Sequence, residues 1–104
     1  IRDMDISVND LKGRMDSGDT DFVLIDVREP AEHEAFNIGG TLIPVGTIAG
    51  ALDELEEHRD KEVIVYCRSG ARSGMAQGFL QQAGFKNVRN LTGGMLAWQS
   101  AFVE

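Results

Sequence analysis

Short apolar runs alternate with segments of helical periodicity along this chain. The two strongest runs, 22–25 and 63–66, are continuously apolar, which is typical of strands that are buried on both faces. Weaker strand patterns occur at 42–43 and 88–91. Because strands separated by helices pair mostly in parallel with right-handed crossovers, the pattern predicts an α/β fold.

Helical patterns fill the intervals between these strands. Ser7 is suited to the N-cap of a helix that ends near 17–18, and Pro30 to the first position of a short helix. Thr47 is suited to cap a helix whose second half, 54–58, is solvated. Two further helices are predicted at 74–83, with Met75, Phe79 and Leu80 on one apolar face, and at 95–102.

The bulk composition is that of an ordinary globular domain. At 104 residues, with 42% hydrophobic and 26% charged residues, the chain is long enough for one hydrophobic core, so we expect a single domain over 1–104. No apolar run approaches the roughly 18–20 residues that span a bilayer, which excludes a membrane protein. The net charge of −7 argues against a nucleic-acid partner, since phosphate backbones are bound by clusters of Lys and Arg.

The cysteine content bears on location and on cofactors. One cysteine cannot form an internal disulfide, which fits a reducing compartment, so we expect a cytoplasmic protein. No Cys or His cluster has the spacing of a zinc site, and we expect neither a metal nor another cofactor. The chain begins at Ile1 rather than Met, which leaves open that a segment or domain has been removed from a longer protein.

The one cysteine, Cys67, lies where the second strong strand meets a helical pattern. It is followed by a short loop with a glycine and two arginines, Arg68 and Arg72. A lone cysteine in a small domain is commonly a buried small hydrophobe. A packing cysteine gains nothing from adjacent cations, whereas cations and a helix N-terminus lower a thiol pKa from ~8.5 to roughly 3.5–7.5. The local sequence therefore favours a nucleophilic thiolate at Cys67.

Other polar residues are expected near the same edge of the sheet. Asp26 and Arg28 follow the first strong strand, and the carboxyl ends of parallel strands meet at one edge, where active sites lie. Arg28 either lends positive potential to the site or forms an ion pair with Asp26 that braces the loops, and we favour the brace. His33 and His58 are expected at exposed helix positions without a role in the chemistry, although His33 is close enough in sequence to approach the site.

The chain resembles the rhodanese (sulfurtransferase) homology domain over almost its whole length. The resemblance is carried by an ordered set of motifs: Asp26-Val-Arg-Glu29, Gly39-Gly40 leading to Leu42-Ile-Pro44, Cys67-Arg-Ser-Gly-Ala-Arg72, and Leu91-Thr-Gly-Gly-Met-Leu-Ala-Trp98. It implies a single five-stranded parallel sheet flanked by helices, with the Cys67 loop between a strand end and a helix start. The Cys-x4-Arg spacing is that of sulfur-accepting loops, whereas related phosphatases have a loop one residue longer.

The resemblance also implies a role for each residue of the loop. Cys67 is the catalytic nucleophile, and the loop from Arg68 to Ser73 binds substrate through inward-facing amides. Within it, Arg68 and Arg72 are expected to hold an oxyanionic donor, and Gly70 to permit the tight turn. Each of the two serines either adds a hydroxyl hydrogen bond or serves in capping or solvent contact, and the remaining position is Ala71. The substrate-binding set is thus Arg68, Ser69, Gly70, Ala71, Arg72 and Ser73, with Asp26 and Arg28 as structural support.

The expected reaction is ping-pong sulfur transfer by a monomer. The Cys67 thiolate takes the outer sulfur from a small-molecule donor such as thiosulfate, and a thiophilic acceptor then removes it from the Cys67 persulfide. The acceptor could be cyanide, a small thiol or a protein cysteine. Two alternatives remain at this point: a persulfide carrier or interaction module within a larger protein, and a relative of phosphatases or arsenate reductases, which the short loop disfavours.

Overall fold

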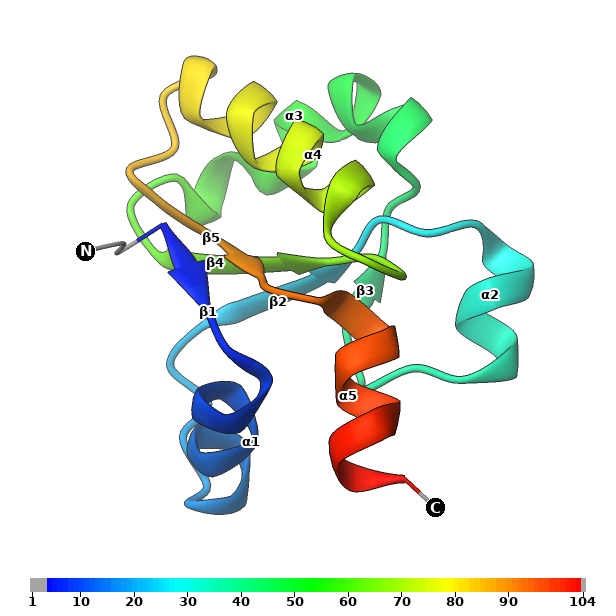
Figure 1. Cartoon of the computed structure of the whole chain (residues 1–104). Helices are drawn as coiled ribbons and strands as arrows, with labels where there is room; N and C mark the ends of the chain where they lie inside the picture. The colour runs from blue at the N-terminus through cyan, green and yellow to red at the C-terminus, as the bar shows by residue number, and fades with distance from the viewer. Residues whose placement is uncertain (1–3, 104) are drawn as a thin grey trace.

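Strands and helices alternate along the chain, as the hydrophobic pattern predicts (Figure 1). A computed structural model describes residues 4–103. The strands are β1 (Asp5–Ile6), β2 (Val23–Asp26), β3 (Thr41–Leu42), β4 (Glu62–Tyr66) and β5 (Asn87–Leu91). The helices are α1 (Val8–Asp16), α2 (Pro30–Ala35), α3 (Leu52–Leu55), α4 (Ala71–Gln82) and α5 (Gly94–Phe102), with 3₁₀ helices η1 (Val45–Ala51) before α3 and η2 (Glu56–His58) after it.

The five strands form one parallel sheet in the order β1-β5-β4-β2-β3, which confirms the predicted fold class. The central strand β4 pairs with β2 on one side, where Ile25 lies opposite Val65, and with β5 on the other. The edge strand β1 has two residues, and no apolar run marks it in the sequence. Its pairing with β5 depends on Ile6, which is buried beside Leu91.

Two layers of helices cover the two faces of the sheet. Figure 1 shows α3 and α4 above the sheet and α1 and α5 below it. The side chains of β4 alternate between these layers, because successive residues of a strand point to opposite faces. Val63 and Val65 lie in the core beneath α4, while Ile64 and Tyr66 lie in the core against α1 and α5. Cys67 continues the alternation and lies in the core on the α4 side.

The ends of α1 agree with the predicted ones, and those of α4 do not. Ser7 caps α1, its side chain accepting a hydrogen bond of 3.0 Å from the amide of Asp10. Helix α4 begins at Ala71, three residues before the predicted start, so the end of the Cys67 loop forms its first turn. Its buried face carries Ala76 and Leu80, whereas Met75 is 67% exposed. The prediction that Met75 lies on the apolar face was wrong: the buried positions Ser73, Ala76 and Leu80 are spaced three and four residues apart and define one stripe, and Met75 lies about 100° from Ala76, on the solvent side.

The region after β3 also differs from the prediction. Thr47 does not cap a regular helix, because the chain enters the 3₁₀ helix η1 directly after Pro44. The hydroxyl of Thr47 instead donates to the carbonyl of Pro44 at 2.9 Å, within the first turn of that helix. Ile48 and Leu55 are buried in the core. Within residues 4–103, no helix is long and apolar enough to cross a membrane.

The corrected face of α4 gives a test of the packing. Leu80 is fully buried and Met75 is 67% exposed on the same helix. We expect Leu80→Ala to lower the free energy of unfolding by about 2–5 kcal/mol, since it leaves a cavity beneath α4. The matched control Met75→Ala should change it by less than about 0.5 kcal/mol. Urea denaturation of both variants checks this, and a larger loss for Met75→Ala would show that α4 is wrongly oriented.

Candidate active site

The sulfur of Cys67 is surrounded by hydrogen-bond donors at the start of α4. Cys67 is 1% exposed, and its Sγ accepts hydrogen bonds from the amide of Gly70 at 3.1 Å and from the amide of Ser73 at 3.4 Å. Gly70 has φ +108°, a left-handed conformation that favours glycine, and this conformation closes the loop around the sulfur. The arrangement is an anion-binding nest at a helix N-terminus.

These donors make Cys67 more acidic than an ordinary cysteine. Burial raises the pKa of the Cys67 thiol, but hydrogen bonds from Ser73 and from the amides of Gly70 and Ser69 outweigh burial, so that the pKa is lowered. From the sequence, Arg68 and Arg72 were expected to contribute to this effect. In the structure, hydrogen bonds make the largest contributions to stabilising the thiolate.

The hydroxyl of Ser73 lies between two acceptors. It is 3.4 Å from the Cys67 Sγ and 2.6 Å from Oδ1 of Asn90, at the end of β5. A hydroxyl has one hydrogen to donate, so the two acceptors compete for it. The Asn90 amide also donates to the carbonyl of Gly70 at 3.2 Å. Asn90 therefore braces both sides of the loop, while the fixed amide hydrogens of Gly70 and Ser73 remain directed at the sulfur.

The start of α5 holds the outer side of the loop. The amides of Met95 and Leu96 donate to the carbonyls of Cys67 and Arg68, each at 2.9 Å. Gly94 makes this approach possible: a Cβ at this position would lie 2.5 Å from the Cys67 carbonyl oxygen, and its φ is +55°. Two carbonyls of the loop are thus directed away from the sulfur and toward α5.

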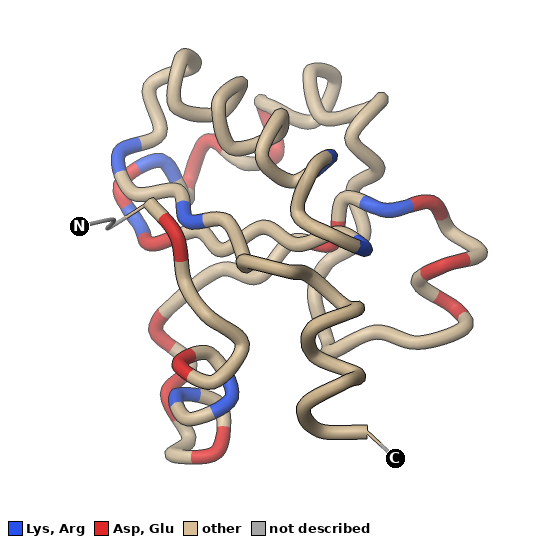
Figure 2. Tube along the Cα trace, viewed as in Figure 1, with Lys and Arg blue, Asp and Glu red and all other residues tan. Residues whose placement is uncertain are grey.

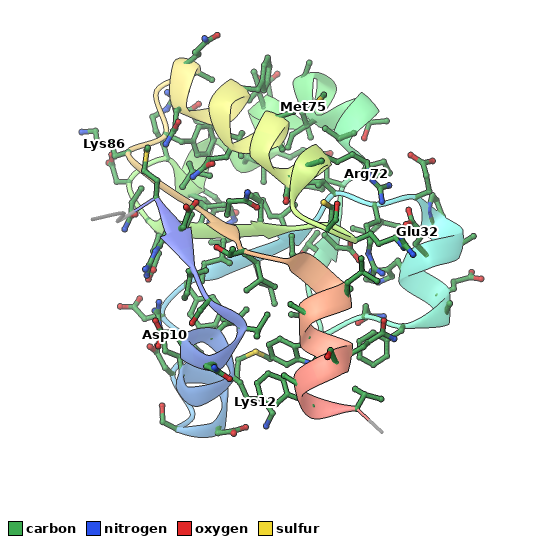
Figure 3. The ribbon with its side chains drawn as sticks, in the orientation of Figure 1. Asp10, Lys12, Glu32, Arg72, Met75 and Lys86 are labelled. Carbon is green, nitrogen blue, oxygen red and sulfur yellow. The ribbon has the colours of Figure 1, made fainter. Side chains whose placement is uncertain are left out.

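Arg72, in the first turn of α4, is paired with a carboxylate from another helix. Its Nη1 and Nη2 donate to Oε1 and Oε2 of Glu32 in α2 at 2.8 and 2.9 Å. Figure 3 shows the two side chains directed toward each other between α4 and α2. The hydrogen bonds from Arg72 lower the pKa of Glu32 to about 2, so the carboxylate stays charged at neutral pH. Arg72 is therefore an ion-pair partner of Glu32 in this structure.

Asp26 and Arg28 form a buried ion pair beside the site. Asp26 is fully buried and Arg28 is 5% exposed; Arg28 Nε and Nη2 donate to the two carboxylate oxygens at 2.9 and 2.8 Å. Arg28 Nη2 also donates to the carbonyl of Phe36 at 2.6 Å, which ties the end of α2 to the sheet. Burial raises the pKa of Asp26, but the hydrogen bonds from Arg28 and His33 outweigh it and lower the pKa. This geometry is that of a brace.

His33 and His58 differ from the expected exposed positions. His33 is half-buried, and its Nδ1 lies 2.8 Å from Oδ2 of Asp26. It therefore joins α2 to the buried ion pair, which the sequence argument missed. His58 is also half-buried; its nearest charged partner, Glu57, lies 3.6 Å away, and the site does not include it.

The remaining loop residues lie at the surface. Arg68, Ser69 and Ala71 are exposed. Glu32 and Asn90 were not anticipated as parts of the site. The sequence marks both residues only weakly. Glu32 is an acidic residue in the first turn after Pro30, and Asn90 is a polar residue within an apolar strand pattern. Among residues 4–103, no group of three or more His, Cys, Asp or Glu is placed to hold a metal ion.

Comparison with known proteins agrees with this geometry. The sequence model of one family, the rhodanese-like domain, matches residues 7–101. A sulfurtransferase from Allochromatium vinosum is 42% identical over 79 residues, which cover 75% of this chain and 72% of that protein. A protein from Bacillus subtilis named "Putative sulfur carrier protein YrkF" is 38% identical, covering 90% of this chain and 50% of that protein. The crystal structure of a rhodanese-related protein from Thermoplasma volcanium superposes with a TM-score of 0.82 at 31% identity, over 96% and 94% of the two chains.

The acidity of Cys67 can be measured directly, because it is the only thiol. The rate of alkylation by iodoacetamide should reach half its maximum well below the value of ~8.5 for free cysteine, since the thiolate is the reactive form. Ser73→Ala removes a hydroxyl donor and should move the midpoint upward, while the amide donors keep it below that of free cysteine. A wild-type midpoint equal to that of free cysteine would contradict the role of the amides.

Proposed function

The chain belongs to the rhodanese-like domain family, and from this membership we propose that it transfers a sulfane sulfur from a donor to a thiophilic acceptor through a persulfide on Cys67. The observation that carries the proposal is the Cys67 sulfur itself, buried and facing the amides of Gly70 and Ser73. The lowered pKa provides a nucleophile without a general base. Similarity to a named sulfurtransferase and to a named sulfur carrier supports sulfur as the transferred atom.

The first half-reaction loads the cysteine. The Cys67 thiolate attacks the outer sulfur of thiosulfate, the bond between the two thiosulfate sulfurs breaks, and sulfite leaves with the electron pair. The product is a Cys67 persulfide anion, and no proton or external electron is needed. The amides of Gly70 and Ser73 are already directed at the Cys67 sulfur before the reaction, so the attacking thiolate is stabilised without reorganisation of the loop.

The second half-reaction transfers the sulfur from the Cys67 persulfide to the acceptor. A thiophile attacks the outer persulfide sulfur, and the Cys67 thiolate is the leaving group. The hydrogen bonds that lower the pKa of Cys67 stabilise this leaving group as well, because a less basic thiolate leaves faster. Cyanide, a small thiol or a protein cysteine can serve as the acceptor in this scheme. We propose that the protein acts as a monomer, in the cytoplasm, without a cofactor or a nucleic-acid partner.

A carrier role is the second candidate, and the similarity to YrkF favours it. A carrier and an enzyme form the same persulfide on Cys67, and they differ in how fast a small acceptor discharges it. The chain also matches only half of YrkF, so a comparable module can belong to a longer protein. Multiple-turnover kinetics with thiosulfate and cyanide separate the two candidates, because a carrier specific for a protein acceptor would load with thiosulfate but turn over slowly.

Intact mass spectrometry tests the proposed chemistry. Incubation with thiosulfate should add one sulfur, ~32 Da, to the protein, and cyanide should remove it, since Cys67 is the only nucleophilic thiol.

Cys67→Ser is the matched control. It should remain folded and show neither mass change, because serine is close in size but its hydroxyl is not ionised at neutral pH. A wild-type mass that stays constant with thiosulfate and with a low-molecular-weight persulfide would contradict sulfur transfer through Cys67.

A further inference from the structure

Most of the positive charge near the Cys67 sulfur is already neutralised by carboxylates. Arg28 is paired with Asp26, and Arg72 with Glu32, in both cases through two hydrogen bonds. Among the ion pairs of residues 4–103, none involves Arg68, which is exposed. The structure thus differs from an open cluster of cations, which would favour a dianionic donor such as thiosulfate.

The positive charge of Arg72 interacts with the Cys67 thiolate. Its hydrogen bonds to Glu32 raise the pKa of Arg72, and the charges of Glu32, Cys67 and Glu29 raise it further against the effect of burial. The guanidinium therefore lies within electrostatic reach of the Cys67 thiolate. The pair with Glu32 is partly exposed, with 32% and 29% of the two side chains accessible, so an incoming donor meets both charges together.

Glu32 is held in its position from its own helix. Its Oε1 accepts a hydrogen bond of 2.9 Å from the amide of Glu29, in addition to the one from Arg72. Helix α2 buries none of its residues, so polar contacts rather than apolar packing place this carboxylate. Figure 2 shows acidic positions along α2 and basic positions at the start of α4.

We propose that Glu32 is a positioning residue that sets donor specificity: by neutralising Arg72, it selects against dianionic donors and for persulfides whose carrier has little negative charge. This inference rests on the proposed function. With a persulfide R–S–SH, the Cys67 thiolate attacks the outer sulfur, the S–S bond breaks, and RS⁻ leaves, so that Cys67–S–SH forms without an oxidant or reductant. Such a donor loses little when Arg72 is neutralised, whereas the dianion thiosulfate would gain more from an unpaired cation at this position.

Two donors that differ by one charge provide the first test. Thiosulfate is a dianion and methanethiosulfonate a monoanion, and each transfers its outer sulfur to Cys67, releasing sulfite or methanesulfinate. Glu32→Gln keeps an oxygen that can accept from the Glu29 amide while removing the charge. We expect this variant to raise the ratio of kcat/KM for thiosulfate to that for methanethiosulfonate about fivefold, through KM, because one unit charge a few ångströms away changes the affinity by roughly this factor.

Two alkylating agents provide a second test that does not depend on sulfur chemistry. Iodoacetate and iodoacetamide also differ by one negative charge and react with the same thiolate. The ratio of the iodoacetate rate to the iodoacetamide rate at Cys67 should rise by about the same fivefold factor in Glu32→Gln. Any change in the pKa of Cys67 cancels in this ratio, since both agents depend equally on the thiolate fraction.

The controls separate the Arg72 contact from general charge and from structure. Glu34→Gln removes an equal charge from an exposed position on the same helix and should change either ratio less than twofold. Glu32→Asp keeps the charge and should restore ratios near those of the wild type. Equal effects of Glu32→Gln and Glu34→Gln, or equal acceleration of both alkylating agents, would overturn the proposal. A wild type that forms no persulfide with either donor would refute the proposed function, while the alkylation ratio would still decide the role of Glu32.

Discussion

The burial of the Cys67 sulfur is the constraint on which the rest of the site depends. A sulfur that is 1% exposed loses its hydration, and this alone would favour the neutral thiol. Successive side chains of β4 point to opposite faces of the sheet. Cys67 therefore lies in the core under α4, as Val63 and Val65 do, and its sulfur loses its hydration there. The donors within hydrogen-bond distance at that position are the amides of Gly70 and Ser73 and the hydroxyl of Ser73. A reactive thiolate at this position therefore requires the loop to keep its conformation.

Elements far from the loop in sequence keep it in that conformation. The amides of Met95 and Leu96, at the start of α5, hold the carbonyls of Cys67 and Arg68. In a planar trans peptide the carbonyl and the following amide point in opposite directions, so holding the Arg68 carbonyl outward turns the Ser69 amide inward. That amide is one of those that lower the pKa of Cys67. The first turn of α5 thus contributes to the acidity of the sulfur through the backbone of the loop.

The sequence predicts the parts of this site that follow from local rules. The apolar strands, the Ser7 cap and the Cys67 loop could be recognised because each depends on neighbouring residues. The contacts of Glu32 with Arg72 and of His33 with Asp26 join segments 40 and 7 residues apart through side chains, and no periodicity indicates them. The exposure of Met75 was missed because the buried stripe of α4 is made of small or polar residues, Ser73 and Ala76, together with Leu80, so that hydrophobicity alone does not mark the buried face.

Stabilising the sulfur mainly through hydrogen bonds has a consequence for selectivity. If Arg68 and Arg72 supplied most of that stabilisation, a change in the charge at the entrance would strongly change the nucleophile. In this structure the hydroxyl of Ser73 and the amides of the loop make the largest contributions to lowering the pKa of Cys67, while Arg72 is occupied by Glu32 in a partly exposed pair. The reactivity of the sulfur and the electrostatic potential met by a donor therefore depend mainly on different groups. Substitutions on α2 can alter which donors approach with little change in the chemistry at Cys67.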